Sequence, residues 1–178
     1  RDGAVRPAST LATLPTEFFA GTTARSTRAP ALKARYFRFA PHETYSPLDY
    51  EHGYGWMVSE FALFRDGARV DWPAGGSATV TGGDMNTSNG SAVSKLCDNV
   101  TTGGTDNSTL HRVFVTQMPS WAEIDAGEEV AFDGYGFYSA AGGGFLNRIP
   151  VSWTFSVSSD GTTWHEVDNR VQERSAVN

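Results

Sequence analysis

The sequence predicts an all-β protein, built as an antiparallel β-sandwich or jelly roll. Short stretches in which apolar and polar residues alternate occur at roughly even spacing along the chain. Clusters of Gly, Asn, Asp and Ser separate them, as turns between strands do. No window of about twelve residues carries a helical apolar stripe. With 178 residues, the chain is long enough to bury a core of its own.

Composition divides the chain into two parts. Residues 1–33 are rich in Ala, Thr, Pro and Arg without a sustained period, which predicts a linker or the tail of a preceding segment. Residues 34–178 form the predicted sandwich domain. The first 38 residues carry a net charge of +5 and the remainder −11, giving −6 in all. An acidic body argues against nucleic acid as a partner, and no apolar run approaches the ~20 residues that span a bilayer.

The first strands are predicted in the middle third of the chain. "ARYFRFAP" (34–41) alternates, with Phe37 and Phe39 on one face. "WMVSEFALFRDGARV" (56–70) predicts a strand, a turn at Asp66-Gly67 and a second strand. "GSATVTGG" (76–83) is short and typical of a sheet edge. Cys97 lies in an apolar run and is predicted to be buried rather than reactive.

The later strands follow the same pattern. "RVFVTQ" (112–117) and "SWAEIDAG" (120–127) are predicted strands, with an exposed turn at Glu128-Glu129. "VAFDGYGFYSA" (130–140) is predicted as one strand that its glycines interrupt, where a bulge would fit. The segment 148–170 predicts a hairpin around Asp160-Gly161. Its core-facing residues are Val151, Trp153, Phe155 and Val157, and Trp164 is expected to pack on the sheet.

Four segments resemble the discoidin family, also called the coagulation factor 5/8 type C domain. "RIPVSWTFSVSSDGTTWHEVDNR" (148–170) is similar to the family's Arg-x-Pro, Trp strand and Ser-x-Asp-Gly turn. "AVSKLCDNVTTGG" (92–104) resembles its Asp-Gly loop followed by threonine. "SWAEIDAGEEVAFDGYGFYSA" (120–140) resembles its Asp-x-Gly and Gly-Tyr strands. "ARYFRF" with "MVSEFALF" resembles its Arg-Tyr and Ser-Glu strands, which usually come last in the family but here come first.

The resemblance implies a galactose-binding-domain-like sandwich and a function in recognition. In bacteria the family overlaps carbohydrate-binding module family 32, whose members are attached to secreted glycoside hydrolases, sulfatases and adhesins. It therefore implies a secreted or cell-surface protein, more in keeping with a bacterial than a eukaryotic source, in which this domain belongs to a larger chain. The expected ligands are glycans such as galactose- or N-acetylhexosamine-terminated chains.

The resemblance also implies a structural Ca²⁺ beside the ligand loops. Carried over residue by residue, its ligands fall on Asp98, Thr101 or Thr102, and Glu60, with backbone carbonyls. Ca²⁺ prefers six to eight such oxygens. The sequence departs from the family at Asn99, where Gly is usual, and at Val100, where a second Asp often stands. The alternative is an Asx-turn that caps the loop without an ion.

Two segments carry the side chains that sugar recognition needs, which are flat aromatic rings with a few polar groups. The insertion "PHETYSPLDYEHGYGW" (41–56) is long and aromatic for a connection. "AAGGGFLNRIP" (140–150) offers an aromatic and polar groups beside glycines. The candidate ligand residues are Tyr45, His52, Tyr54, Trp56, Trp72, Phe145, Asn147 and Arg148. Alternatives stay open: Trp56 as a core residue, Arg148 as a structural hydrogen-bonder and Asn147 as a turn residue.

Catalysis is not expected. The chain offers no Gly-x-Ser-x-Gly, and adjacent carboxylates such as Glu128 and Glu129 point to opposite faces of a strand. The histidines and acids of 41–56 match no zinc spacing. The sequence therefore predicts a non-catalytic carbohydrate-binding module attached to a larger protein such as a glycoside hydrolase. The alternatives are a protein-interaction or adhesion domain and a structural spacer, neither with a sugar site.

Overall fold

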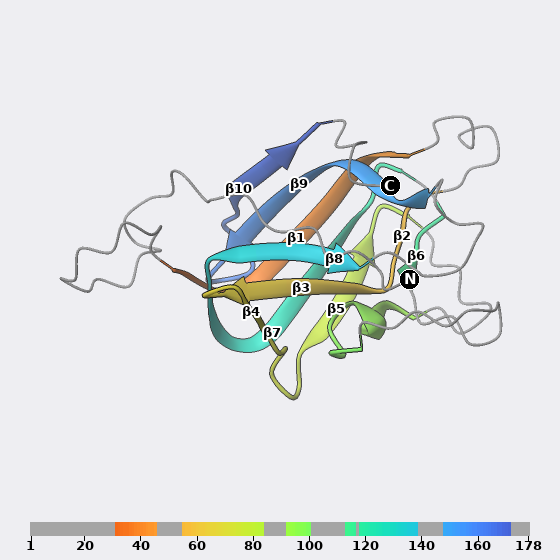
Figure 1. Cartoon of the computed structure of the whole chain (residues 1–178). Coiled ribbons are helices and arrows are strands. Elements are labelled where there is room, and N and C mark those ends of the chain that lie inside the picture. The colour runs from red at the N-terminus through yellow and green to blue at the C-terminus, as the bar shows by residue number, and fades with distance from the viewer. Residues whose placement is uncertain are drawn as a thin grey trace.

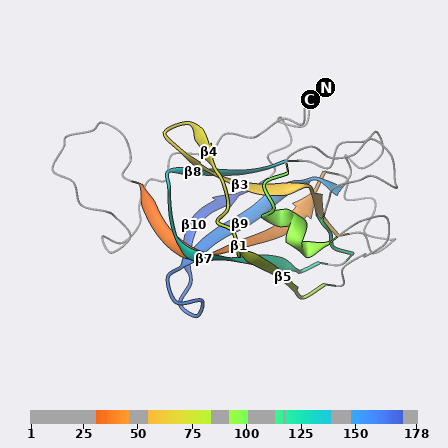
Figure 2. The ribbon, with the colours of Figure 1, turned by 90° about the horizontal axis from the view of Figure 1, so that it is seen from below.

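The fold is all-β and antiparallel, as the sequence predicts. A computed structural model describes residues 31–45, 55–83, 92–100, 113–116, 118–138 and 148–171. The predicted linker, apart from its last three residues, lies outside them. The described strands form two layers, which Figure 2 shows one above the other. Regular structure begins at Leu32, two residues before the predicted boundary.

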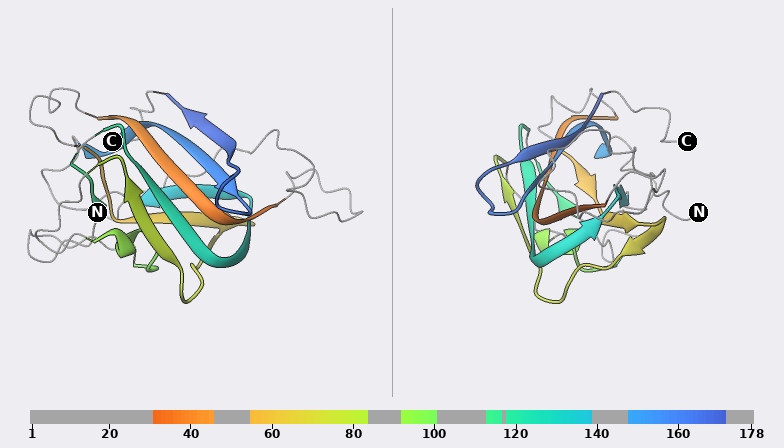
Figure 3. Two further views of the ribbon diagram at one scale, coloured as in Figure 1. Left: turned by 180° about the vertical axis from the view of Figure 1, so that it is seen from behind. Right: turned by 90° about the vertical axis from the view of Figure 1, so that its left-hand side faces the viewer.

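The larger layer is a five-stranded sheet in the order β10-β9-β1-β7-β5. Its strands are β1 (Leu32–Thr44), β5 (Ser77–Thr81), β7 (Trp121–Phe132), β9 (Pro150–Ser158) and β10 (His165–Arg170). In the centre, Phe37 of β1 lies opposite Ile124 of β7 and Val157 of β9. Figure 1 shows β1 running between these two neighbours, and the left panel of Figure 3 shows the sheet from behind.

The smaller layer is a three-stranded sheet in the order β4-β3-β8, joined by a short pair, β2-β6. Its members are β2 (Met57–Val58), β3 (Glu60–Arg65), β4 (Ala68–Val70), β6 (Val113–Phe114) and β8 (Gly134–Tyr138). A 3₁₀ turn, η4 (Val93–Leu96), lies beside β5. In Figure 1 the three-stranded sheet crosses in front of the five-stranded one.

Aromatic rings fill the space between the sheets. Phe37 and Phe39 of β1 and Phe155 of β9 are buried from one layer, and Phe61 of β3 and Tyr135 of β8 from the other. The Tyr135 and Phe155 ring centroids are 4.2 Å apart, a close contact, and those of Phe39 and Phe61 are 5.3 Å apart, within the usual range for aromatic pairs. The predicted alternation of β1 and β9 therefore places the expected residues in the core.

Both predicted Asp-Gly turns are present. Asp66 and Gly67 each have a positive φ, of 56° and 77°, as a two-residue hairpin turn of the primed type requires. At the other turn, Gly161 has a φ of 75°. The Asp160 carboxylate there accepts hydrogen bonds from the backbone N–H groups of Thr162 and Thr163, each at 2.7 Å. These contacts lower the pKa of Asp160.

The segment from residue 120 to 140 differs from the prediction. Instead of two strands separated by a turn, residues 121–132 form one strand, β7, in which residues 126–129 bulge opposite Arg35 alone. Glu128 and Glu129 are exposed on this bulge. The predicted second strand is also divided, because the chain leaves the five-stranded sheet at Phe132 and enters the three-stranded sheet at Gly134.

The remaining expectations concern Cys97, two tryptophans and membrane-spanning segments. Cys97 is a buried free thiol, as predicted, and burial raises its pKa to about 11, with Glu60 and Asp98 adding to the shift. Trp153 is buried and Trp164 packs on the sheet, also as predicted. In the described ranges, no helix is both long and apolar enough to cross a bilayer.

Candidate functional site

One end of the sandwich brings together the bases of both aromatic segments that the sequence singles out. Tyr45 follows β1, and its backbone N–H donates to the carbonyl oxygen of Ile149, at 2.9 Å, just before β9. The backbone N–H of Ser59, between β2 and β3, donates to the carbonyl oxygen of Tyr138, the last residue of β8. We call this end, defined by Tyr45, Ser59, Tyr138 and Ile149, the rim.

The described ligand candidates at the rim are Tyr45 and Arg148. The Tyr45 residue is 40% exposed, and Arg148, beside Ile149, is half-buried. The described part of the rim therefore has one exposed aromatic residue, and its backbone is hydrogen-bonded to the residue that follows Arg148. The remaining loop candidates, His52, Tyr54, Phe145 and Asn147, lie outside the described residues, as do Thr101 and Thr102 of the expected metal set.

The two other tryptophan candidates are core residues, which corrects the expectation that they contact a ligand. Trp56 is fully buried, and its Nε1 donates to Ser120 Oγ at 3.0 Å. Trp72 is also buried, and its Nε1 donates to the carbonyl oxygen of Phe61 at 2.8 Å. Each indole thus satisfies its one donor inside the protein and packs against a core phenylalanine, so neither offers a ring face to a sugar.

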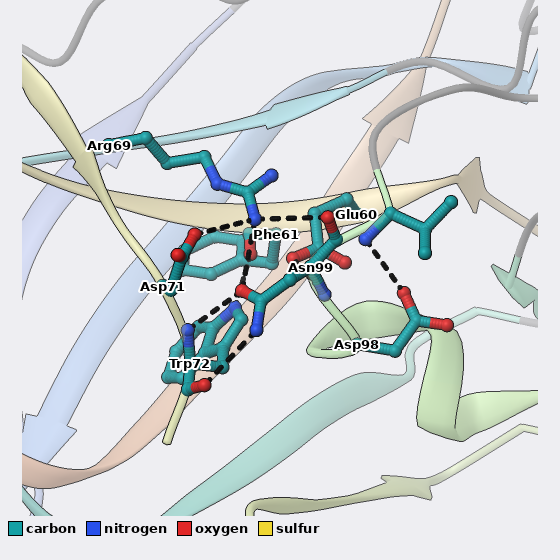
Figure 4. Close-up of polar contacts among 8 residues, drawn as sticks. Glu60, Phe61, Arg69, Asp71, Trp72, Asp98 and Asn99 are labelled. Carbon is teal, nitrogen blue, oxygen red and sulfur yellow. Dashed lines mark hydrogen bonds and ion pairs between the residues drawn. The ribbon is translucent and has the colours of Figure 1, made fainter. Parts of the chain in front are cut away.

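A buried carboxylate lies close to the rim, at the first residue of β3. Glu60 is fully buried, and its Oε1 accepts a hydrogen bond from the backbone N–H of Asn99 at 3.2 Å (Figure 4). Its Oε2 is buried without a hydrogen-bond partner among the described residues. Burial, and next the charge of Asp98, raise the pKa of Glu60 to about 8, against smaller lowering effects of the Arg69 charge and of backbone hydrogen bonds.

Asp98 is the second carboxylate of this region. Its Oδ1 accepts a hydrogen bond from the backbone N–H of Val100 at 3.1 Å, so the Asx-turn that the sequence offered as an alternative is present. This turn does not account for Oε2 of Glu60, which has no hydrogen-bond partner among the described residues. Burial, and after it the charges of Glu60 and Asp98, raise the pKa of the Cys97 thiol.

The chemistry of these oxygens fits a hard cation. A fully buried glutamate with an oxygen unpartnered among the described residues, close to the exposed Asp98 whose charge acts on it, is an arrangement that Ca²⁺ would stabilise. Within the described ranges, no group of three or more His, Cys, Asp or Glu side chains is assembled for a metal. Two carboxylates would therefore need further oxygens from backbone carbonyls or hydroxyls.

Two residues of this region were not expected from the sequence. Arg69 of β4 and the side chain of Asn99 connect the 98–100 segment to the chain around Trp72. Asn99 was noted only as a departure from the family's Gly. The one available signal was that Asn, like Gly, tolerates a positive φ, and Asn99 has a φ of 67°.

Comparisons with known proteins add no relative. No family model matches the chain, and no match is found among curated proteins or among solved structures. The likeness to the discoidin family therefore rests on the sequence motifs and on the all-β sandwich alone.

Proposed function

We propose that this protein is a non-catalytic carbohydrate-binding module of the discoidin type, which binds glycans at the rim. The observation that carries the proposal is the backbone hydrogen bond from Tyr45 to Ile149. It holds the base of segment 41–56 against the base of segment 140–150. These are the two segments that supply the aromatic and polar candidates, so both are anchored at one site.

The composition of the rim suits a sugar. Tyr45 is an exposed ring, and a ring of this kind stacks on the C–H face of a pyranose. Arg148, next in sequence to Ile149, is proposed as a donor to sugar hydroxyl groups. His52, Tyr54, Phe145 and Asn147 are proposed to complete the site. Terminal galactose or N-acetylhexosamine is the proposed ligand class, within a larger secreted or cell-surface protein.

A structural Ca²⁺ is part of the proposal. Glu60 and Asp98 would hold it, together with backbone carbonyls and the hydroxyl of Thr101 or Thr102. When bound, the ion supplies positive charge that compensates two neighbouring carboxylates and fixes the loop after η4. The support for it is the orphaned Oε2 of Glu60 in a fully buried position.

Glycan-array binding tests the proposal. Single sites of this kind are expected to bind with Kd on the order of 10⁻⁵ to 10⁻³ M, so the protein should be displayed multivalently. The variants are Tyr45→Ala, Tyr54→Ala and Phe145→Ala. The matched control is Lys33→Ala, which removes an exposed side chain at the opposite end of β1.

The expected result is binding to galactose- or N-acetylhexosamine-terminated glycans by the native protein and by Lys33→Ala, with loss in the three aromatic variants. If the native protein binds no glycan on the array, the sugar proposal is wrong, and a protein-interaction domain takes its place. If it binds and all three aromatic variants bind equally well, the rim is not the site.

A further inference from the structure

We infer that Asn99 is the positioning residue of the proposed cation site, and that its side-chain amide, rather than its backbone conformation alone, holds Asp98 and Glu60 in place. The inference rests on the calcium part of the proposed function. It concerns a position where this chain departs from the family's usual Gly.

The backbone of Asn99 adopts a conformation that most residues avoid. Its φ of 67° lies in the left-handed region, which Gly enters freely and Asn tolerates better than other residues. In this conformation its N–H points at Glu60 Oε1, at 3.2 Å. Asn99 thus keeps the geometry that a glycine would allow. A glycine would not supply the side-chain contacts.

The amide of Asn99 pairs with the backbone of Trp72 as a neighbouring strand would. Its Oδ1 accepts from the backbone N–H of Trp72 at 2.8 Å, and its Nδ2 donates to the carbonyl oxygen of Trp72 at 3.1 Å. Figure 4 shows both bonds on the same edge of Trp72. Because two bonds are made from one planar group, they fix both the position and the orientation of Asn99.

Arg69 adds a charged contact to the same residue. Its Nη2 donates to Asn99 Oδ1 at 3.0 Å and to the Asn99 carbonyl oxygen at 3.1 Å, and it also contacts Asp71 Oδ1 at 3.1 Å. The Arg69 side chain is 20% exposed, so these bonds are partly shielded from water. No hydrogen bond joins Arg69 to Glu60 among the described residues, although the Arg69 charge partly offsets the rise that burial causes in the pKa of Glu60. Of the two Glu60 oxygens, Oε2 has no hydrogen-bond partner within the described ranges.

These contacts close a ring through the core. Trp72 is buried, and its Nε1 is bonded to the carbonyl oxygen of Phe61, the residue that follows Glu60. The position of Glu60 is therefore linked through Phe61 and Trp72 to Asn99, and Asn99 is adjacent to Asp98. A cation bridging the two carboxylates needs this distance fixed before it binds. Groups that orient metal ligands in this way change metal affinity by about 10- to 100-fold when they are removed.

The experiment is a calorimetric titration of the metal-free protein with CaCl₂. A second readout compares the thermal unfolding temperature in CaCl₂ with that in EDTA. Asn99→Gly permits the positive φ and removes only the amide. Its matched control is Asn169→Gly, which makes the same change at an exposed position of β10. Arg69→Gln is a second variant, which keeps the Asn99–Trp72 pair and removes the guanidinium.

The expected result is that Asn99→Gly binds Ca²⁺ at least about tenfold more weakly than the native protein, while Asn169→Gly binds normally. The Ca²⁺ affinity of Arg69→Gln should lie between those of Asn99→Gly and Asn169→Gly. If Asn99→Gly does not fold, the affinity of Arg69→Gln tests the inference in its place. Equal affinity of the native protein and both site variants overturns the role of Asn99 and leaves the calcium site standing. If the native protein itself takes up no Ca²⁺, the proposed ion and the inference fail together, whereas the glycan array still decides the sugar site.

Discussion

At the scale of single residues, Glu60 is a carboxylate whose burial is costly. A fully buried carboxylate with one oxygen unpartnered among the described residues cannot stay ionised cheaply. Either protonation of this carboxylate or binding of a cation would remove the cost of its buried charge. The raised pKa of about 8 corresponds to the first and the proposed Ca²⁺ to the second. The two differ in how stability depends on pH.

In the metal-free protein, we expect the free energy of unfolding to fall as pH rises from about 4.5 to about 8. The folded pKa of Glu60 lies above its ordinary value of 4.5, so the folded state holds a proton that the unfolded chain has lost. Stability from this group is complete below pH 4.5 and is lost as pH rises through 8. The slope is at most about 1.4 kcal/mol per pH unit. Urea unfolding in EDTA at several pH values measures it.

Glu60→Gln is the control for this dependence, because an amide of nearly the same shape does not titrate. The difference in unfolding free energy between the native protein and Glu60→Gln should change across the window, and other titrating groups cancel in it. A constant difference from pH 4.5 to 8 would show that Glu60 ionises normally. Saturating CaCl₂, if it binds, should remove the slope in the native protein.

The cation ligands stay a prediction. Glu60 and Asp98 were proposed from motif resemblance, and the structure shows Glu60 Oε1 bonded to the backbone N–H of Asn99, the residue after Asp98. Trp72 was expected at a ligand and is buried, and for Trp56 the alternative of a core residue is the one found. An indole that begins or follows a strand has the same local sequence whether it faces a ligand or the core. The contacts of Asn99 reach Arg69 and Trp72, 30 and 27 residues away, and no short-range pattern encodes such pairs.

At the scale of the elements, Arg38 connects three strands of the five-stranded sheet through its side-chain contacts. Arg38 of β1 lies 3.9 Å from the ring centroid of Trp164, at the start of β10, and 5.6 Å from that of Trp121 on β7. Its Nε and Nη2 donate to Glu123 Oε1 at 2.9 and 2.6 Å, and Trp121 Nε1 donates to the same oxygen. The stack connects the edge strand β10 to the middle of the sheet.

We predict a coupling energy of about 0.5–1 kcal/mol between Arg38 and Trp164, since both are partly exposed. The measurement is a double-mutant cycle with Arg38→Gln and Trp164→Leu, scored by chemical unfolding. Arg65→Gln paired with Trp164→Leu is the comparison cycle, because Arg65 is exposed at the β3–β4 turn and contacts Asp66 instead. If the two cycles give the same coupling, the stack contributes nothing to joining β10 to the sheet.

The elements show where sequence patterns suffice. Asp66-Gly67 and Asp160-Gly161 were placed correctly, because a turn that needs positive φ is written in two adjacent residues. The passage at Asp133 was missed. The apolar positions run through Val130 and Phe132 and then through Tyr135 and Phe137, so the two-residue alternation slips by one residue at Asp133 and Gly134. A bulge within one strand and a passage from one sheet to the other leave the same pattern in the sequence. A period of two identifies a strand without saying which sheet it joins.

At the scale of the whole molecule, the two sheets are joined by more than apolar packing. Tyr135 of β8 projects across the core, and its hydroxyl donates to Asp168 Oδ2 of β10 at 2.7 Å. The same hydroxyl oxygen accepts from Trp153 Nε1 of β9 at 2.9 Å. Arg170 donates to Asp168 Oδ2 at 2.8 Å and closes the network toward solvent. Burial, then the bond to Asp168, raises the pKa of Tyr135.

Tyr135→Phe is predicted to lower the free energy of unfolding by about 1–3 kcal/mol, although it removes only one oxygen. The ring keeps its contact with Phe155, but Trp153 Nε1 loses its acceptor in a buried position and Asp168 loses a donor. Tyr45→Phe removes an equivalent oxygen from an exposed ring and should change stability by less than about 0.5 kcal/mol. Urea unfolding of the two variants measures both. Because this hydroxyl is shared by strands of both layers, equal and small losses would mean that the sheets are held together by ring packing alone.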